Sequence, residues 1–167
     1  MTTQTRTDLS TQVYQIYIKA TPQAIWDAIT KPEWTTKYAY RCESLYELRP
    51  GGAFKSIANE GMRAVGLPEV VVDGEVLEAD PPHKLVQTWR FHFSEENIAE
   101  GFARLTYEVA EAGPGISSLT VVHDQLENAP LMAAAVASPW RENAGGGWSW
   151  ILSDLKSLLE TGKTLDE

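Results

Sequence analysis

Residues 74–91 contain two stretches of alternating apolar residues joined by Pro81 and Pro82. A proline has no backbone N–H for a sheet ladder and presets φ near a turn value, so the two prolines mark a tight connection. Residues 76–79 and 85–93 are therefore predicted to form two antiparallel strands. This hairpin limits the chain to folds built on an antiparallel sheet.

The alternation within residues 85–93 places the side chains on two faces of the strand. One face carries three aromatic rings and two other side chains: Leu85, Gln87, Trp89, Phe91 and Phe93. The other face carries Val86, Thr88, Arg90 and His92. Such an aromatic face needs a covering element, and the long helical pattern of the chain lies in residues 142–161. We therefore expect a curved sheet that holds a helix around an apolar cavity.

The predicted C-terminal helix has an apolar stripe at helical spacing. Its members are Trp148, Ile151, Leu152, Leu155 and Leu159. Gly162 follows the stripe and is expected to end the helix. Residues 12–20 predict a first strand, and two short helices should begin near Pro22 and Pro32. Further strands are expected at residues 42–48, 53–58, 102–110 and 116–126.

The fold class predicted from this order is α+β, with about seven strands around the last helix. Residues 62–69 and 94–101 are expected to be connections between strands. Residues 131–139 are rich in alanine and are expected to form a hinge or lid. We divide the chain into a loosely held N-terminal tail at residues 1–11, a single domain at residues 12–162 and a C-terminal tail at residues 163–167.

Composition excludes several functional classes. A net charge of −9 would repel phosphate backbones, so we expect no nucleic-acid partner. Residues 1–11 lack the apolar core of a signal peptide, and no apolar run approaches the roughly 18 residues of a membrane span. Cys42 is the single cysteine, which suits a reducing compartment. The sequence thus predicts a cytoplasmic protein without a membrane partner.

Four segments resemble a known family. They are Ala20-Thr-Pro-Gln-Ala-Ile-Trp26, Leu48-Arg-Pro-Gly-Gly-Ala-Phe54, residues 74–90, and Gly147-Trp148 ahead of the leucine stripe. Together with the element order, they make residues 12–160 similar to the START-like (SRPBCC) superfamily, in the branch of the activator of Hsp90 ATPase homologues. The resemblance implies a helix-grip fold with a deep cavity between the sheet and the last helix.

The resemblance leaves three functions open. The first is binding of a hydrophobic or aromatic small molecule in the cavity, without a cofactor. The second is an enzyme similar to polyketide cyclases and dehydratases, or to hydrolases, in which the cavity shapes the substrate. The third is a chaperone-associated adaptor. A homodimer is compatible with each of the three.

The candidate catalytic residue is His123, because alternation with Leu119 and Val121 turns it toward the presumed cavity. A histidine at a strand end is also often a hydrogen-bonded core residue, and both interpretations stay open. Candidate ligand contacts are the polar Gln87 and a set of large rings: Trp34, Tyr38, Phe54, Trp89, Phe91, Trp140 and Trp148. The three histidines have no recognised metal-binding spacing, so no metal site is expected.

Overall fold

The computed structural model describes residues 10–137 and 146–167. Along the chain its elements are β1 (Gln12–Ile18), α1 (Pro22–Thr30), α2 (Pro32–Thr35), β2 (Glu43–Tyr46), β3 (Ala53–Ile57), α3 (Glu60–Ala64), β4 (Val70–Asp80), β5 (Lys84–Phe91), α4 (Glu95–Glu100), β6 (Ala103–Gly113), β7 (Ile116–Asp124), the short 3₁₀ helix η2 (Leu126–Asn128), α5 (Pro130–Ala135) and α6 (Gly147–Thr161). This order is the predicted one, with additional short helices between the strands.

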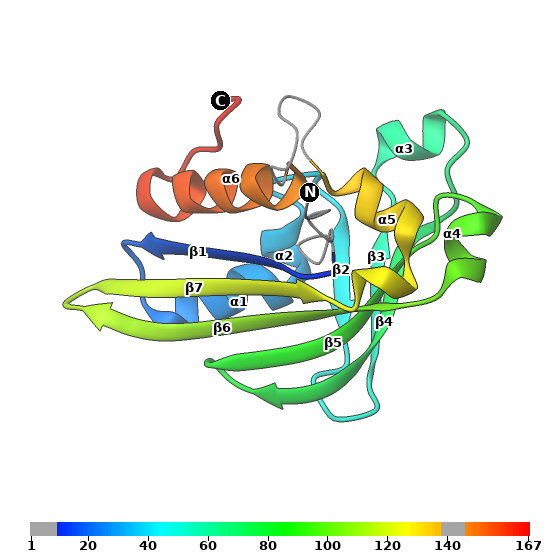
Figure 1. The fold of residues 1–167 in the computed structure, drawn as a ribbon. Coiled ribbons are helices and arrows are strands. Elements are labelled where there is room, and N and C mark those ends of the chain that lie inside the picture. Colours follow the sequence, from blue (N-terminus) through cyan, green and yellow to red (C-terminus); the bar gives the residue numbers. More distant parts are fainter. Residues whose placement is uncertain (1–9, 138–145) are drawn as a thin grey trace, which may run out of the picture.

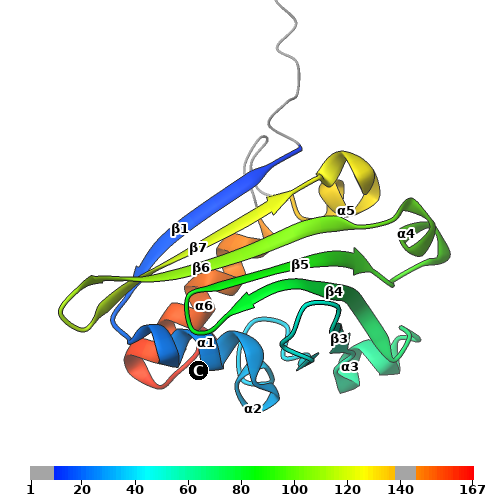
Figure 2. The same cartoon turned by 90° about the horizontal axis from the view of Figure 1, so that it is seen from below.

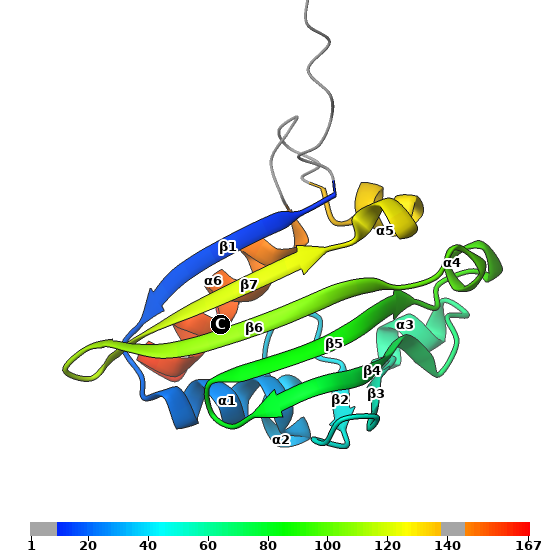
Figure 3. The ribbon, with the colours of Figure 1, turned by 60° about the horizontal axis from the view of Figure 1, so that its bottom comes forward.

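The strands form one antiparallel sheet in the order β1-β7-β6-β5-β4-β3-β2. The sheet is curved, and α1 and α6 lie on its concave side (Figure 1). Seen from below, the strands cross in front of α6, and α1 and α2 lie near the end where the helix finishes (Figures 2 and 3). The predicted helix-grip arrangement is therefore confirmed.

The main core lies between the inner face of the sheet and the two longer helices. Trp148, Leu152 and Leu155 of the α6 stripe are buried, and Leu105 and Leu119 meet them from the sheet. Each such side chain stabilises the folded state by about 1.5–3 kcal/mol through the apolar surface it removes from water. The stripe therefore anchors α6 to the sheet.

The ends of the helices follow from local sequence. The Thr21 side chain accepts a hydrogen bond from the backbone N–H of Ala24 at 3.2 Å, and Pro22 occupies the first turn of α1. Gly162 adopts a φ of 79° and donates its N–H to the Leu158 carbonyl, which ends α6. The start of α6 is at Gly147 rather than at the predicted residue 142, and residues 142–145 lie outside the described part of the chain.

The hairpin predicted around Pro81 and Pro82 is present, but its first strand is longer than expected. β4 begins at Val70, six residues before the predicted start, and pairs with β5 as far as Asp80. The polar Asp73 and Gly74 interrupt the alternating pattern in this part of the strand. Gly74 is required there, because a Cβ atom would lie 1.9 Å from the Thr88 carbonyl oxygen of β5.

Two segments predicted as irregular contain helices. Residues 94–101 hold α4, whose first turn is capped by the Ser94 side chain, which accepts from the Asn97 N–H at 3.2 Å. Residues 131–137 hold most of α5, whose Leu131 and Met132 N–H groups donate to the Glu100 carboxylate at 2.8 and 3.1 Å. Side-chain caps thus stabilise two helices too short for a clear apolar period.

The connection expected at residues 62–69 also contains part of a helix. The Asn59 side chain accepts from the Met62 N–H at 2.8 Å and begins α3. Of the predicted N-terminal tail, only residues 10 and 11 are described, and the Ser10 carbonyl accepts from the Leu126 N–H at 3.1 Å. Among the helices described, none has the length and apolar character needed to cross a membrane.

Candidate functional site

A pocket of about 350 Å³ lies between α6, the inner face of the sheet and the segment before β2. The sheet lines it with Tyr46, Phe54, Trp89, Phe91 and Tyr107. From α6 come Trp148, Ile151, Leu152 and Leu155. Residues 38–42 and the end of α5 supply further walls. Its volume falls within the roughly 300–1,000 Å³ typical of small-molecule sites.

Aromatic rings in mutual contact form the sheet side of the pocket. The centroids of Trp89 and Phe91 are 5.0 Å apart, and those of Tyr46 and Phe54 are 4.5 Å apart. Trp89 also meets Trp148 of α6 at 5.8 Å. These tilted contacts fix the ring orientations, so the wall is formed by the packing of the protein itself.

His123 lies behind this aromatic wall and does not line the pocket. It is fully buried, and its Nδ1 accepts a hydrogen bond from the Trp148 indole N–H at 3.1 Å. Its ring is nearly perpendicular to that of Trp89, with the two ring centroids 5.0 Å apart. Burial lowers the pKa of His123 to about 4, against a smaller opposing effect of Asp124, so the imidazole is neutral at neutral pH. His123 therefore joins α6 to the sheet.

Gln87 is also fully buried, and it lies two residues before Trp89 on the same face of β5. Its Oε1 accepts a hydrogen bond from the Tyr46 hydroxyl at 2.8 Å. Within the described residues, Gln87 Nε2 and His123 Nε2 are the buried side-chain atoms without a hydrogen-bond partner. Gln87 thus positions Tyr46, which lines the pocket, and does not line the pocket itself.

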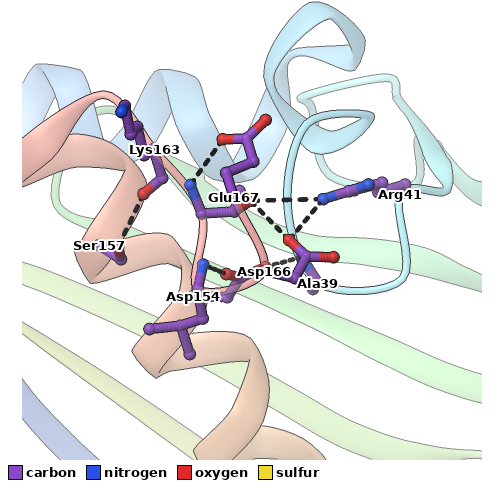
Figure 4. A network of polar contacts seen from close by, with 9 residues as sticks. Ala39, Arg41, Asp154, Ser157, Lys163, Asp166 and Glu167 are labelled. Atoms are coloured by element: carbon purple, nitrogen blue, oxygen red, sulfur yellow. Dashed lines mark hydrogen bonds and ion pairs between the residues drawn. The ribbon is translucent and has the colours of Figure 1, made fainter.

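The segment before β2 is held in place by a buried carboxylate of α6. Asp154 accepts the N–H of Ala39 and the N–H of Leu165, both at 2.7 Å (Figure 4). Ala39 and Arg41 have φ values of 56° and 55°, a region that side chains other than glycine rarely adopt. Asp154 therefore compensates for an unfavourable backbone at the pocket wall.

The predicted C-terminal tail takes part in the same network. Arg41 donates to Asp166 at 2.9 Å, and the Thr164 hydroxyl donates to the same carboxylate at 2.7 Å (Figure 4). Thr164 is buried. Residues 163–167 thus fold back from Gly162 and cover the outer side of the segment at residues 38–42, whose inner side lines the pocket.

The structure brings five of the predicted contact residues to one pocket: Tyr38, Phe54, Trp89, Phe91 and Trp148. Trp34 instead lies at a second pocket with Lys37, whose ammonium group is 4.5 Å from the Trp34 ring centroid. Gln87 and His123 do not line the pocket. Trp140 lies outside the described residues.

Several residues that line the pocket were not among the predicted contacts. Tyr46 and Tyr107 lie on predicted strands but were not among the predicted ligand contacts. Cys42 and Met62 meet at the pocket, with their sulfur atoms 3.7 Å apart. Alternation along β2 and β6 could have identified both tyrosines as inward-facing. Over the described residues, no three His, Cys, Asp or Glu side chains are grouped in a way that could hold a metal ion.

The curved sheet, the long helix across it and the pocket between them define a helix-grip protein. The chain belongs to the family described as Activator of Hsp90 ATPase homolog 1-like protein, which it matches over residues 19–160. The resemblance inferred from the sequence is therefore confirmed. No curated protein matches the chain.

Solved structures share the fold at low sequence identity. The Hsp90 activator PFC0360w from Plasmodium falciparum is 17% identical, with a TM-score of 0.62 over 90% of this chain and 96% of that one. The Aha1 dimer from Colwellia psychrerythraea is 19% identical, with a TM-score of 0.63 over 92% and 98%. DynU16, a protein of the dynemicin biosynthetic locus, is 17% identical, with a TM-score of 0.62 over 93% and 49%. These similarities concern the fold alone.

Proposed function

We propose that this protein binds a hydrophobic or aromatic small molecule in the pocket between α6 and the sheet. The observation that carries the proposal is a pocket of about 350 Å³ whose walls are rings and aliphatic side chains from both elements. Apolar walls with a few polar groups are typical of small-molecule sites. Because the rings are fixed by contacts with one another, the pocket is preformed, which lowers the entropic cost of binding.

Tryptophan fluorescence tests this proposal, because Trp89 and Trp148 both line the pocket. Titration with a neutral aromatic compound should change the emission with saturation at one site. Ser56→Leu places a larger side chain at the pocket wall and should weaken binding at least tenfold. Ser118→Leu is the matched control, because Ser118 lies on β7 between the inward-facing Ser117 and Leu119 and faces the other side of the sheet.

Equal binding by the two serine variants, with both folded by circular dichroism, would contradict the proposed pocket. Native mass spectrometry of protein purified from its own host adds an independent test. A retained mass that disappears in the Ser56→Leu variant would support binding in the pocket. A mass retained equally by both variants would contradict it.

The geometry favours binding over catalysis. An enzyme of cyclase, dehydratase or hydrolase type needs a group that exchanges protons with the substrate. His123 lies outside the pocket, its Nδ1 already accepts the Trp148 N–H, and its pKa is lowered to about 4 by burial. Tyr107 does line the pocket, but burial raises its pKa well above the usual value, which makes it a poor base near neutral pH.

An adaptor function at a chaperone is the second candidate, and the description of the family favours it. PFC0360w, which shares the fold, is itself an Hsp90 activator. The assay is the ATPase rate of Hsp90 with and without this protein. A rate increase that is unchanged in the Ser56→Leu variant would favour the adaptor, whereas no increase would remove it.

A homodimer and a cytoplasmic location belong to the same proposal. The Colwellia psychrerythraea relative is described as a dimer, which supports testing the oligomeric state by analytical ultracentrifugation. Sedimentation as a monomer at the highest protein concentration tested would remove the dimer, because dimer formation depends on protomer concentration. The single Cys42 supports a reducing compartment.

A further inference from the structure

Four tyrosines line the pocket, which also carries the hydroxyl groups of Thr35, Ser44 and Ser56. Tyr40 is 50% exposed, and the other three tyrosines are more deeply buried. Tyr38 precedes β2, Tyr46 ends β2 and Tyr107 lies on β6, and all three line the pocket. Burial raises the pKa of Tyr46 and of Tyr107, and negative charge on a neighbouring tyrosine raises it further: Tyr38 acts on Tyr46, and both act on Tyr107. Segments distant in the sequence thus bring three phenol groups to one region of the pocket.

The hydrogens of two of these hydroxyls are already used inside the protein. Tyr38 donates to the Ala28 carbonyl at 2.9 Å, and Tyr46 donates to Gln87 Oε1 at 2.8 Å. Their oxygens therefore offer only acceptor lone pairs to a ligand. The Tyr107 hydroxyl makes no hydrogen bond within residues 10–137 and 146–167, so it can both donate and accept. This combination matches a ligand hydroxyl, which is also a donor and an acceptor.

The same region is unfavourable for an anion. Arg41 is the one charged residue among the described lining residues, and its guanidinium donates to Asp166 and Thr164 on the outer side of the segment (Figure 4). The buried Asp154 carboxylate lies near enough to raise the pKa of Tyr38, after the larger effect of burial. A ligand carboxylate would therefore lose its water and meet negative charge without a free cation to compensate.

We propose that the pocket selects neutral molecules whose apolar, aromatic body carries a hydroxyl group, and that Tyr107 is the residue that recognises this hydroxyl. This inference rests on the proposed function, because it specifies the chemical class of the ligand for the same pocket. The Tyr107 hydroxyl would donate to the ligand oxygen, and the ligand hydroxyl would donate to the oxygen of Tyr38 or Tyr46. The aromatic body would contact the Trp89 and Trp148 rings.

Three compounds with one ring system test the inference: naphthalene, 2-naphthol and 2-naphthoate. Equilibrium dialysis at pH 7 measures the affinity of each for the wild-type protein. We expect 2-naphthol to bind about tenfold more tightly than naphthalene, as gained hydrogen bonds in a buried site imply. We expect 2-naphthoate to bind more weakly than naphthalene, because its charge would be buried without a partner.

Tyr107→Phe removes the hydroxyl and breaks no hydrogen bond among the described residues. In this variant the preference for 2-naphthol over naphthalene should fall to about twofold or less, with naphthalene affinity unchanged. Tyr17→Phe is the matched control, because Tyr17 is 57% exposed and faces away from the core on β1, and it should keep the full preference.

The possible failures are distinguishable. If naphthalene binds and 2-naphthol binds no better, or if 2-naphthoate binds most tightly, the inference about ligand class is overturned while the pocket keeps its proposed function. If Tyr107→Phe retains the full preference, the role of Tyr107 is overturned. If none of the three compounds binds, the proposed function fails and the inference fails with it.

Discussion

Acidification should weaken the attachment of α6 to the sheet through His123. In the folded protein, burial lowers the pKa of His123 to about 4, from an ordinary value of 6.5. The unfolded chain therefore binds more protons between these two values, so the free energy of unfolding falls as the pH decreases through this range. The contribution of the neutral imidazole is fully present above pH 6.5 and is lost by about pH 4.

The expected loss is roughly 3 kcal/mol over this range, since each unit of pKa difference corresponds to about 1.4 kcal/mol. The geometry gives the physical reason. Nδ1 accepts the Trp148 indole N–H at 3.1 Å, so a proton on Nδ1 would replace this hydrogen bond by a contact between two donors. In the neutral ring the hydrogen is on Nε2, because Nδ1 accepts from Trp148. The added proton must therefore bind to Nδ1, at the contact with Trp148.

Urea unfolding at pH 7 and pH 4.5 measures this effect in the wild type and in His123→Gln. The variant keeps a polar side chain of similar size but cannot titrate, and both proteins share all other ionisable groups. The wild type should therefore lose about 2–3 kcal/mol more than the variant between the two pH values. Equal losses, or an imidazole pKa near 6.5 in the folded protein by nitrogen NMR, would refute the reasoning.

Two further predictions concern the framework of the pocket. Asp154→Ala removes a buried carboxylate and leaves the N–H groups of Ala39 and Leu165 without their acceptor, so it should destabilise the protein by about 3–5 kcal/mol in urea unfolding. The surface change Asp27→Ala should cost less than about 1 kcal/mol. Similar costs for the two variants would contradict the role of Asp154. Gly74→Ala brings a Cβ to 1.9 Å from the Thr88 carbonyl oxygen and should lower the melting temperature strongly. The Cβ of Gly113→Ala meets nothing within 4 Å, so this control should leave the melting temperature nearly unchanged. Equal melting temperatures for the two variants would contradict the close approach of β4 and β5 at Gly74.

The sheet and its covering helix were predictable because their patterns are long. Alternation over residues 85–93 placed Trp89 and Phe91 on the inner face, and the stripe from Trp148 to Leu155 placed α6 over it. The short helices α3, α4 and α5 were missed, because each depends on a cap or on a distant carboxylate rather than on an apolar period. Glu100, which binds the first turn of α5, is 31 residues away from Leu131.

The pocket was predictable only in part. Alternation indicates which face a side chain takes, but not how far along the face the pocket extends. His123 faces inward as predicted, yet Trp89 and Trp148 cover it, and this depends on packing between α6 and two strands. Trp34 belongs to α2, whose position relative to the sheet is set by tertiary contacts, and its ring lies beside Lys37 instead of in the pocket.

The central claim is that α6 and the inner face of the sheet enclose space for a neutral small molecule. Isotope-filtered NMR of the 2-naphthol complex tests it directly, because nuclear Overhauser contacts report which protein hydrogens lie within about 5 Å of the ligand, close to packing distance. We expect contacts to the rings of Trp89, Tyr107 and Trp148. Contacts confined to exposed residues such as Val13 or Trp150 would contradict the claim.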